Sequence, residues 1–180
     1  MENKVGNFFL IGLMGSGKTT VGKQLALRMH KQFYDSDHEI VARMGVSITT
    51  IFEIEGEEKF RERESQVIKD LTLQHNIVLA TGGGAVLQEN NRRNLQKNGI
   101  VIYLHASVET ILERTRFDRS RPLLQTENPG QKIQELYTQR DPLYREIADI
   151  VIDANEVFLP NLIKKVTLAI EQYQHNKGTK

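Results

Sequence analysis

Cysteine is absent from this chain of 180 residues, and proline occurs only four times. Without cysteine the chain forms no disulfides, thiolate metal sites or cysteine nucleophiles. Its net charge is also small, because 24 Lys and Arg residues balance 23 Asp and Glu residues. This balance gives no indication of a nucleic-acid or anionic membrane partner. No apolar stretch approaches the roughly 20 residues that a membrane-spanning helix needs.

These absences leave an ordinary globular protein. The length suits a single domain over residues 1–180, large enough to bury a sizeable core. The apolar run near the N-terminus leads directly into a glycine-rich loop, which favours a buried strand over a signal peptide. We therefore expect a cytoplasmic domain that acts as a monomer.

Apolar segments of strand length alternate with helical patterns along the chain. The segments expected to form strands are residues 7–12, 32–37, 76–80, 99–105 and 149–154. Their cores are nearly continuous Val, Ile, Leu and Phe, which is typical of a parallel sheet covered on both faces. The alternation predicts the α/β class, with a doubly wound five-stranded parallel sheet and helices on both faces.

Caps and breakers indicate where several helices begin and end. A helix opens after Gly17, and Ser47 and Ser107 are expected N-caps. Gly56 is expected to break or kink the helical segment around it, and Pro160 to open the last helix.

Residues 116–130 interrupt this alternation, with two of the four prolines and no clear periodicity. A connection of that length is usually a functional lid or a disordered loop. We expect a mobile lid over about residues 114–130 and a flexible tail over about 174–180. A mobile arm can bring a guanidinium to a transferring phosphoryl group while it excludes water. The arginines of this region are Arg114, Arg116, Arg119 and Arg121.

The segment GLMGSGKT, residues 12–19, matches the phosphate-loop pattern G-x-x-x-x-G-K-[ST]. It follows an apolar strand and opens an amphipathic helix, a context that a chance glycine-rich turn would lack. Backbone N–H groups and the positive helix end surround phosphate oxygens in such loops. Lys18 is expected to reach the terminal phosphates, and the Thr19 hydroxyl to bind Mg²⁺. The residues expected to contact the nucleotide are Gly12, Gly15, Ser16, Gly17, Lys18, Thr19 and Thr20.

Three consecutive glycines, residues 82–84, follow the third expected strand and Thr81. Motors and ATPases usually keep a metal-binding acid at the end of this strand. The guanine-reading Asn-Lys-x-Asp segment of regulatory GTPases is also missing. If the loop is well ordered, three glycines cost about 2–3 kcal/mol relative to alanine. Either this is a slack loop, or some group approaches its backbone closely.

Asp35 and Asp37 lie at the carboxyl end of the second expected strand, where open α/β sheets bind ligands. If the backbone is still extended, the two carboxylates share a side. One then faces Mg²⁺ through water, while the other accepts a hydrogen bond from the hydroxyl that is phosphorylated. Alternatively, one of them caps the following helix. Because phosphoryl transfer has a loose transition state, we expect Asp37 to orient the hydroxyl more than to deprotonate it.

The order of the motifs resembles that of the shikimate kinase family, within the nucleoside-monophosphate-kinase-like group. These motifs are GLMGSGKTT, YDSD, IFEIEGEEKFRERE, ATGGGAV, RPLL and RDPLYREIAD, and the match extends from about Phe8 to Asp153. The resemblance implies ATP-dependent phosphorylation of the 3-hydroxyl of shikimate, which gives shikimate 3-phosphate and ADP on the route to chorismate and aromatic amino acids.

On the acceptor side, the resemblance implies that Arg61 and Arg140 bind the substrate carboxylate. Asp37 would bind the ring hydroxyls and the accepting oxygen. Phe52 and Phe60 would line the pocket, although plain core packing also accounts for them. The backbone implied to lie along the substrate is that of Gly82, Gly83 and Gly84.

On the nucleotide side, the resemblance implies that Arg121 closes from the lid onto the phosphates. Arg114 would stack on adenine, and Asn155 would lie near it. Thr19 and Asp35 would form the metal site. The residues with catalytic roles would be Lys18, Asp37 and Arg121.

Two other functions fit parts of the pattern. The chain could be a phosphate-loop kinase of another acceptor, such as gluconate or a nucleoside monophosphate. It could also be a regulatory protein that binds ATP and hydrolyses it slowly, without an acceptor.

Overall fold

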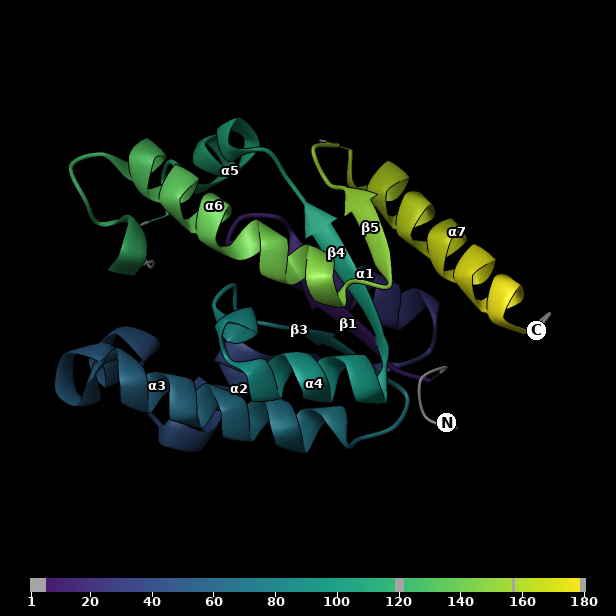
Figure 1. The fold of residues 1–180 in the computed structure, drawn as a ribbon, viewed down its shortest axis with the longest axis horizontal. Helices are drawn as coiled ribbons and strands as arrows, with labels where there is room; N and C mark the ends of the chain where they lie inside the picture. Colours follow the sequence, from purple (N-terminus) through teal and green to yellow (C-terminus); the bar gives the residue numbers. More distant parts are fainter. Residues whose placement is uncertain (1–5, 119–121, 157, 179–180) are drawn as a thin grey trace.

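The structure, a computed structural model, describes residues 6–118, 122–156 and 158–178. One sheet contains the strands β1 (Phe8–Ile11), β2 (Gln32–Asp35), β3 (Ile77–Ala80), β4 (Ile100–His105) and β5 (Ile150–Asp153). All neighbouring strands run parallel, in the order β2-β3-β1-β4-β5 (Figure 1). The predicted doubly wound, five-stranded parallel sheet is confirmed, and each strand lies within its expected segment.

Helices connect the strands and cover the sheet. They are α1 (Lys18–Arg28), α2 (Ser36–Met44), α3 (Ile48–Thr72), α4 (Glu89–Asn98), α5 (Val108–Thr115), α6 (Pro129–Ile147) and α7 (Leu159–Gly178). Two short 3₁₀ turns are η1 (Ala85–Leu87) and η2 (Pro122–Leu124). The sequence did not predict α4 or α6. Helix α4 is almost entirely polar, and α6 contains Pro142 in its interior, so neither gives a clear helical signal.

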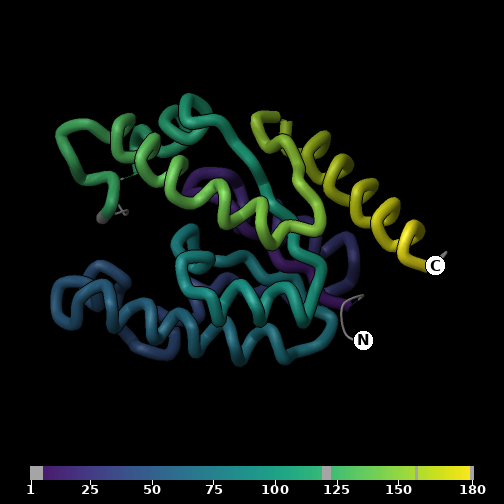
Figure 2. Tube along the Cα trace, viewed as in Figure 1, coloured from purple at the N-terminus to yellow at the C-terminus, as the bar shows by residue number. Residues whose placement is uncertain are grey.

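The two faces of the sheet carry separate hydrophobic clusters, because successive strand side chains point to opposite faces. Phe9 and Leu79 face the cluster formed with α3, α4 and α6. Phe8 and Leu10 face the cluster formed with α1 and α7. Helices α1 and α7, from distant parts of the sequence, therefore lie side by side on one face (Figure 2).

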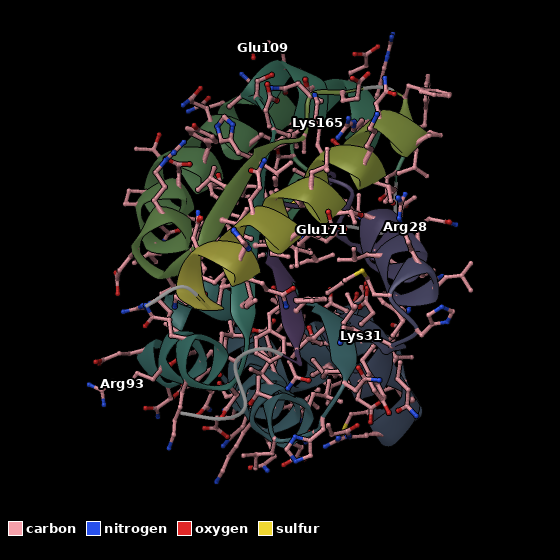
Figure 3. The ribbon with its side chains drawn as sticks, turned by 90° about the vertical axis from the view of Figure 1, so that its right-hand side faces the viewer. Arg28, Lys31, Arg93, Glu109, Lys165 and Glu171 are labelled. Atoms are coloured by element: carbon pink, nitrogen blue, oxygen red, sulfur yellow. The ribbon has the colours of Figure 1, made fainter. Side chains whose placement is uncertain are left out.

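The outer side of α7 carries charges of both signs. Lys165 and Glu171 project from it into solvent, as Arg28 does from α1 (Figure 3). No helix among the described residues is long and apolar enough to span a membrane.

Helix α3 is bent at Gly56, whose φ of 82° and ψ of 172° are not helical. The rings of Phe52 and Phe60, on either side of the bend, lie 4.8 Å apart. The Arg63 guanidinium and the Glu55 carboxylate form a bidentate ion pair across the bend, with N–O distances of 2.7 and 2.8 Å. The predicted kink is confirmed.

The predicted caps are also present. The Ser47 hydroxyl accepts a hydrogen bond from the Thr50 N–H, and the Ser107 hydroxyl accepts one from the Thr110 N–H. Pro160 is the second residue of α7, as expected of a residue that opens a helix.

The segment expected to form the lid is described in part. Arg119 and Arg121 lie outside the described residues. Beyond them, Leu124 is buried and packs on the cluster under α6. The segment expected to form a flexible tail is helical as far as Gly178.

Candidate active site at the carboxyl edge of the sheet

A cavity of about 680 Å³ lies beside the phosphate loop, at the carboxyl ends of β2 and β3. The predicted site residues that line it are Gly15, Ser16, Gly17, Lys18, Thr19, Thr20, Asp35, Asp37, Phe52, Phe60, Arg61, Gly82, Gly83, Gly84, Arg114 and Arg140. Gly12 and Asn155 do not line it, and Arg121 lies outside the described residues. One cavity thus gathers residues from most of the chain's motifs.

The phosphate loop depends on backbone conformations that favour glycine. Gly12, Gly15 and Gly17 have φ values of 144°, 75° and 95°. Because L side chains rarely adopt these angles, glycine is needed at each position. The Lys18 side chain is buried and folds back on the loop, where its ammonium donates to the carbonyls of Gly12 and Leu13 at 2.7 and 2.8 Å.

Thr19 and Asp35 meet at one end of the cavity. The Thr19 hydroxyl donates to one Asp35 oxygen at 2.6 Å. The other Asp35 oxygen accepts from the N–H groups of Asp37 and His38, at 3.0 and 3.2 Å, and so caps α2. The backbone is already helical at Ser36, so the expectation of an extended strand as far as residue 37 is wrong. Asp35 is both the helix cap and the partner of Thr19.

Thr19 and Asp35 supply the hard oxygen donors that Mg²⁺ prefers. Among the described residues, no group of three or more His, Cys, Asp or Glu side chains gathers to hold a metal. This agrees with Mg²⁺ chemistry, since Mg²⁺ in phosphate-transfer sites takes most of its ligands from phosphates and water. The donor set fits a magnesium ion that arrives with a nucleotide.

Glu64 is a buried carboxylate whose place in the site the sequence did not predict. It lies in α3 and is fully buried, and it accepts a hydrogen bond from the Arg61 guanidinium at 2.7 Å. Burial, with a smaller contribution from the Asp37 carboxylate, raises the pKa of Glu64 to about 7. The Arg61 charge acts in the opposite direction and lowers this pKa. Arg61 and Glu64 are three residues apart on a helix, so their contact was foreseeable. The burial of Glu64 was not.

Arg140 reaches the same cavity from α6. It is 3% exposed, and Arg61 is 8% exposed. Burial lowers the pKa of the Arg140 guanidinium, and the nearby Arg61 charge lowers it too. Among the described residues, the Nε atoms of both arginines have no hydrogen-bond partner. Two buried guanidiniums with unused donors suit an anionic ligand.

The three glycines after β3 are needed because their neighbours press against the backbone. None of them has a positive φ. A β-carbon on Gly82 would lie 2.6 Å from a Glu64 oxygen, and one on Gly84 would overlap the Arg61 guanidinium. A β-carbon on Gly83 would lie 3.3 Å from the Met14 nitrogen. Charged side chains lie against Gly82 and Gly84, and the phosphate-loop backbone lies against Gly83, so the slack-loop alternative is wrong.

The other end of the cavity is bounded by Arg114. Its guanidinium donates to the carbonyl oxygen of Ala154 at 2.9 Å. Asn155, which is predicted to lie near the adenine, accepts from the Ser107 N–H at 2.9 Å and donates to Asp153 at 2.7 Å. Asn155 thus supports the end of β5 and the start of α5.

Phe52 and Phe60 line the cavity and also pack against the hydrophobic cluster. Both interpretations of these rings are therefore correct. Cavity residues that the sequence reading did not single out include Met14, His38, Leu123, Glu156 and Leu159. Met14 and Leu123 belong to the motifs GLMGSGKTT and RPLL but were given no role, whereas only the fold brings His38, Glu156 and Leu159 to the cavity.

Comparisons with known proteins agree with this geometry. A family model described as shikimate kinase matches residues 14–171. The shikimate kinase of Chromobacterium violaceum is 55% identical over 180 residues, 99% of this chain and 98% of that protein. The shikimate kinase of Thiobacillus denitrificans is 62% identical over 151 residues, 84% of this chain and 82% of that protein.

A solved structure is similar over nearly the whole chain. It is a shikimate kinase from Acinetobacter baumannii in complex with shikimate, with a TM-score of 0.91 and 48% identity. The match covers 94% of this chain and 95% of that one. Fold, motifs and relatives agree, and the chain belongs to the shikimate kinase family.

Proposed function

We propose that this protein transfers the terminal phosphoryl group of ATP to the 3-hydroxyl of shikimate, which gives shikimate 3-phosphate and ADP. The observation that carries the proposal is one cavity that joins the phosphate loop to two buried arginines, Arg61 and Arg140. Family membership implies ATP as the co-substrate. The reaction would serve the route to chorismate and aromatic amino acids, and its need for ATP favours the cytoplasm.

On the acceptor side, Arg61 and Arg140 bind the substrate carboxylate. A planar guanidinium can bind a carboxylate through two parallel hydrogen bonds, and both side chains are already desolvated. Asp37 orients the accepting hydroxyl, since its carboxylate lies beside the backbone of Gly82. The half-buried backbone of Gly83 lies along the ring.

On the nucleotide side, the phosphate loop binds the phosphates and Lys18 turns from the loop carbonyls toward them. Thr19 and Asp35 hold Mg²⁺, which when bound neutralises charge on the phosphoryl oxygens. Arg114 contacts the adenine end, and Asn155 supports that end through Ser107 and Asp153. The predicted lid residue Arg121 closes onto the phosphates. The proposal includes action as a monomer.

Two alternatives keep the same phosphate loop. One is a kinase of gluconate or a nucleoside monophosphate, and the other is a regulator that hydrolyses ATP slowly. The buried arginine pair favours a small anionic acceptor, because a regulator has no use for a second anion site next to the phosphates.

The decisive experiment measures ADP release with shikimate, gluconate, AMP or no acceptor. With ATP present, we expect ADP release with shikimate but not with gluconate, with AMP or without an acceptor. Equal release without an acceptor would contradict the proposal in favour of a regulator. Turnover only with gluconate or AMP would reassign the acceptor.

Asp37→Asn tests the role of the acceptor carboxylate. Because a positioned catalytic carboxylate contributes about 10²-fold or more, we expect kcat to fall by that factor with little change in the melting temperature. Asp70→Asn is the matched control, since Asp70 pairs with Arg43 on the surface at 2.6 Å. A kcat that survives Asp37→Asn would leave Asp37 as an ordinary residue of the first turn of α2.

A further inference from the structure

Tyr144 joins two parts of the acceptor side. It lies in α6, one turn after Arg140, and its side chain is completely buried. Its hydroxyl donates to the carbonyl oxygen of Gly83 at 2.5 Å. The Arg140 guanidinium lies beside the same group, 3.6 Å from where a β-carbon on Gly83 would stand, and interacts with the Tyr144 hydroxyl. A tyrosine hydroxyl has one donor and can accept as well, so both contacts can form together.

The protonation of Tyr144 fixes the direction of these bonds. Burial raises the pKa of its hydroxyl, against the lowering effect of the Arg140 charge. The hydroxyl therefore keeps its proton at neutral pH and remains a donor to the Gly83 carbonyl. The Gly83 carbonyl oxygen can only accept, so the Tyr144 hydroxyl gives its proton to that oxygen. The Arg140 guanidinium has only N–H donors, so it faces the lone pairs of the same hydroxyl.

The glycine loop has further supports, but none of them reaches the arginine pair. The Gly82 N–H donates to the Ser36 hydroxyl at 2.9 Å. Asn91 and Arg92, from α4, donate to the carbonyls of Ala85 and Val86 at 3.0 and 2.8 Å. Among the hydrogen bonds between described residues, that of Tyr144 is the one that joins this loop to α6, the helix that carries Arg140.

We propose that Tyr144 is a positioning residue, which holds the Arg140 guanidinium and the Gly83 backbone at a fixed separation and so sets the fit of the acceptor. This inference rests on the proposed function, in which Arg140 and Gly83 contact opposite parts of one small acid. Tyr144 itself contacts neither phosphates nor substrate. Its loss should therefore affect acceptor binding and leave nucleotide binding unchanged.

Tyr103 provides a matched control. Its ring stacks against the Tyr144 ring with centroids 4.9 Å apart, and it too is buried. Its hydroxyl donates to the Asp141 side chain at 2.7 Å and makes no described hydrogen bond to the glycine loop. Tyr103→Phe and Tyr144→Phe each remove one hydrogen-bonded hydroxyl from the same aromatic pair.

The test compares KM values for shikimate and ATP, the Kd of shikimate by calorimetric titration, and melting temperatures. We expect Tyr144→Phe to raise both the KM and the Kd for shikimate roughly tenfold, with the KM for ATP unchanged. Tyr103→Phe should leave both KM values within twofold. Equal shikimate KM values for the two variants, or a matching rise in the KM for ATP, would reduce Tyr144 to a structural role.

An Arg140→Lys background separates positioning from general loosening. If Tyr144 acts through Arg140, then Tyr144→Phe should raise the shikimate Kd less than threefold in that background. A full tenfold rise there would contradict the coupling. The unaltered protein decides the underlying function: if it turns over shikimate while Tyr144→Phe binds normally, only this inference fails. If it shows no shikimate turnover, the proposed function and this inference fail together.

Discussion

Two glycine-rich loops border the same cavity, and they need glycine for different physical reasons. In the phosphate loop, Gly12, Gly15 and Gly17 adopt positive φ angles, so the requirement comes from the backbone itself. In the loop of residues 82–84 no φ is positive, and the requirement comes from charged side chains beside Gly82 and Gly84 and from the phosphate-loop backbone beside Gly83. One half of the site is therefore built from backbone, and the other from buried charges.

The largest expected effects come from replacing one cation in each half of the cavity, Lys18 on the nucleotide side and Arg140 on the acceptor side. Lys18→Ala should lower kcat by about 10²–10³-fold, because it removes a donor that stabilises charge on the transferred group. Arg140→Ala should instead weaken shikimate binding by roughly 30-fold or more, the usual loss for one partner of a buried charged contact. Steady-state kinetics and calorimetric titration of each ligand measure both effects.

The two variants serve as controls for each other. Lys18→Ala should bind shikimate within twofold of the unaltered protein, and Arg140→Ala should retain ATP binding. If each variant loses both ligands, the division of the cavity into two halves is wrong.

A smaller effect tests the buried charge of the acceptor half. The pKa of Glu64 is raised from 4.5 to about 7 by burial, so the folded protein holds its proton more tightly than the unfolded chain. The contribution of Glu64 to stability therefore falls as the pH rises from about 4.5 to about 7, by up to roughly 3 kcal/mol. Denaturant titration at pH 5 and pH 8 measures the free energies of unfolding of the unaltered protein and of Glu64→Gln. From pH 5 to pH 8 the unaltered protein should lose more stability than Glu64→Gln.

Glu62→Gln is the control for this pH dependence. Glu62 lies on the same helix, but its side chain is 57% exposed and pairs with Lys59. Its replacement should leave the pH dependence of stability close to that of the unaltered protein. Parallel stability curves for Glu64→Gln and the unaltered protein would show that Glu64 titrates as an ordinary surface acid.

The smallest expected effects address the glycines themselves. Gly17→Ala should cost about 1–2 kcal/mol of stability through its φ of 95°, since a β-carbon there would make only an ordinary contact, 3.9 Å from Val21 Cγ2. Gly17→Asn should recover part of this loss, because Asn tolerates positive φ better. Gly84→Ala should cost about 1–3 kcal/mol through overlap with Arg61. Thermal unfolding of the variants measures these differences.

Rescue identifies the cause at each position. Gly84→Asn should be no better than Gly84→Ala, whereas Arg61→Ala should relieve most of the cost of Gly84→Ala in the double variant. If Gly84→Asn were more stable than Gly84→Ala, the cost at Gly84 would come from its backbone conformation. If Arg61→Ala restored the stability of Gly17→Ala, the cost at Gly17 would come from Arg61. Either result would contradict the cause given for that loop.

The sequence predicted best the features that depend on residues close together in the chain. The phosphate loop, the Ser47 and Ser107 caps and the Gly56 kink all depend on local spacing, and all are present. Helix α4 lacked a hydrophobic stripe, and Pro142 obscured α6. Asp37 was expected at the end of a strand over residues 32–37, but the strand ends at Asp35 and the helix starts at Ser36.

The missing parts of the candidate site depend on contacts between distant segments. Glu64 differs from Glu62, the other acid of FRERE, in being buried beside Arg61 and the glycine loop. Tyr144 contacts Gly83 across 61 positions of sequence. No local pattern reports such a contact, so these two residues became visible only when the fold was known.

The bend at Gly56 has a consequence for how such a site can change. In a straight helix, residues eight apart would be separated by about 12 Å along the axis, yet the Phe52 and Phe60 rings lie 4.8 Å apart. One continuous segment thus forms two adjoining parts of the cavity wall. A change in the angle of this bend reshapes the acceptor wall without altering any residue of the phosphate loop. Substitutions at the bend would therefore alter the proposed acceptor pocket while the phosphate loop keeps its geometry.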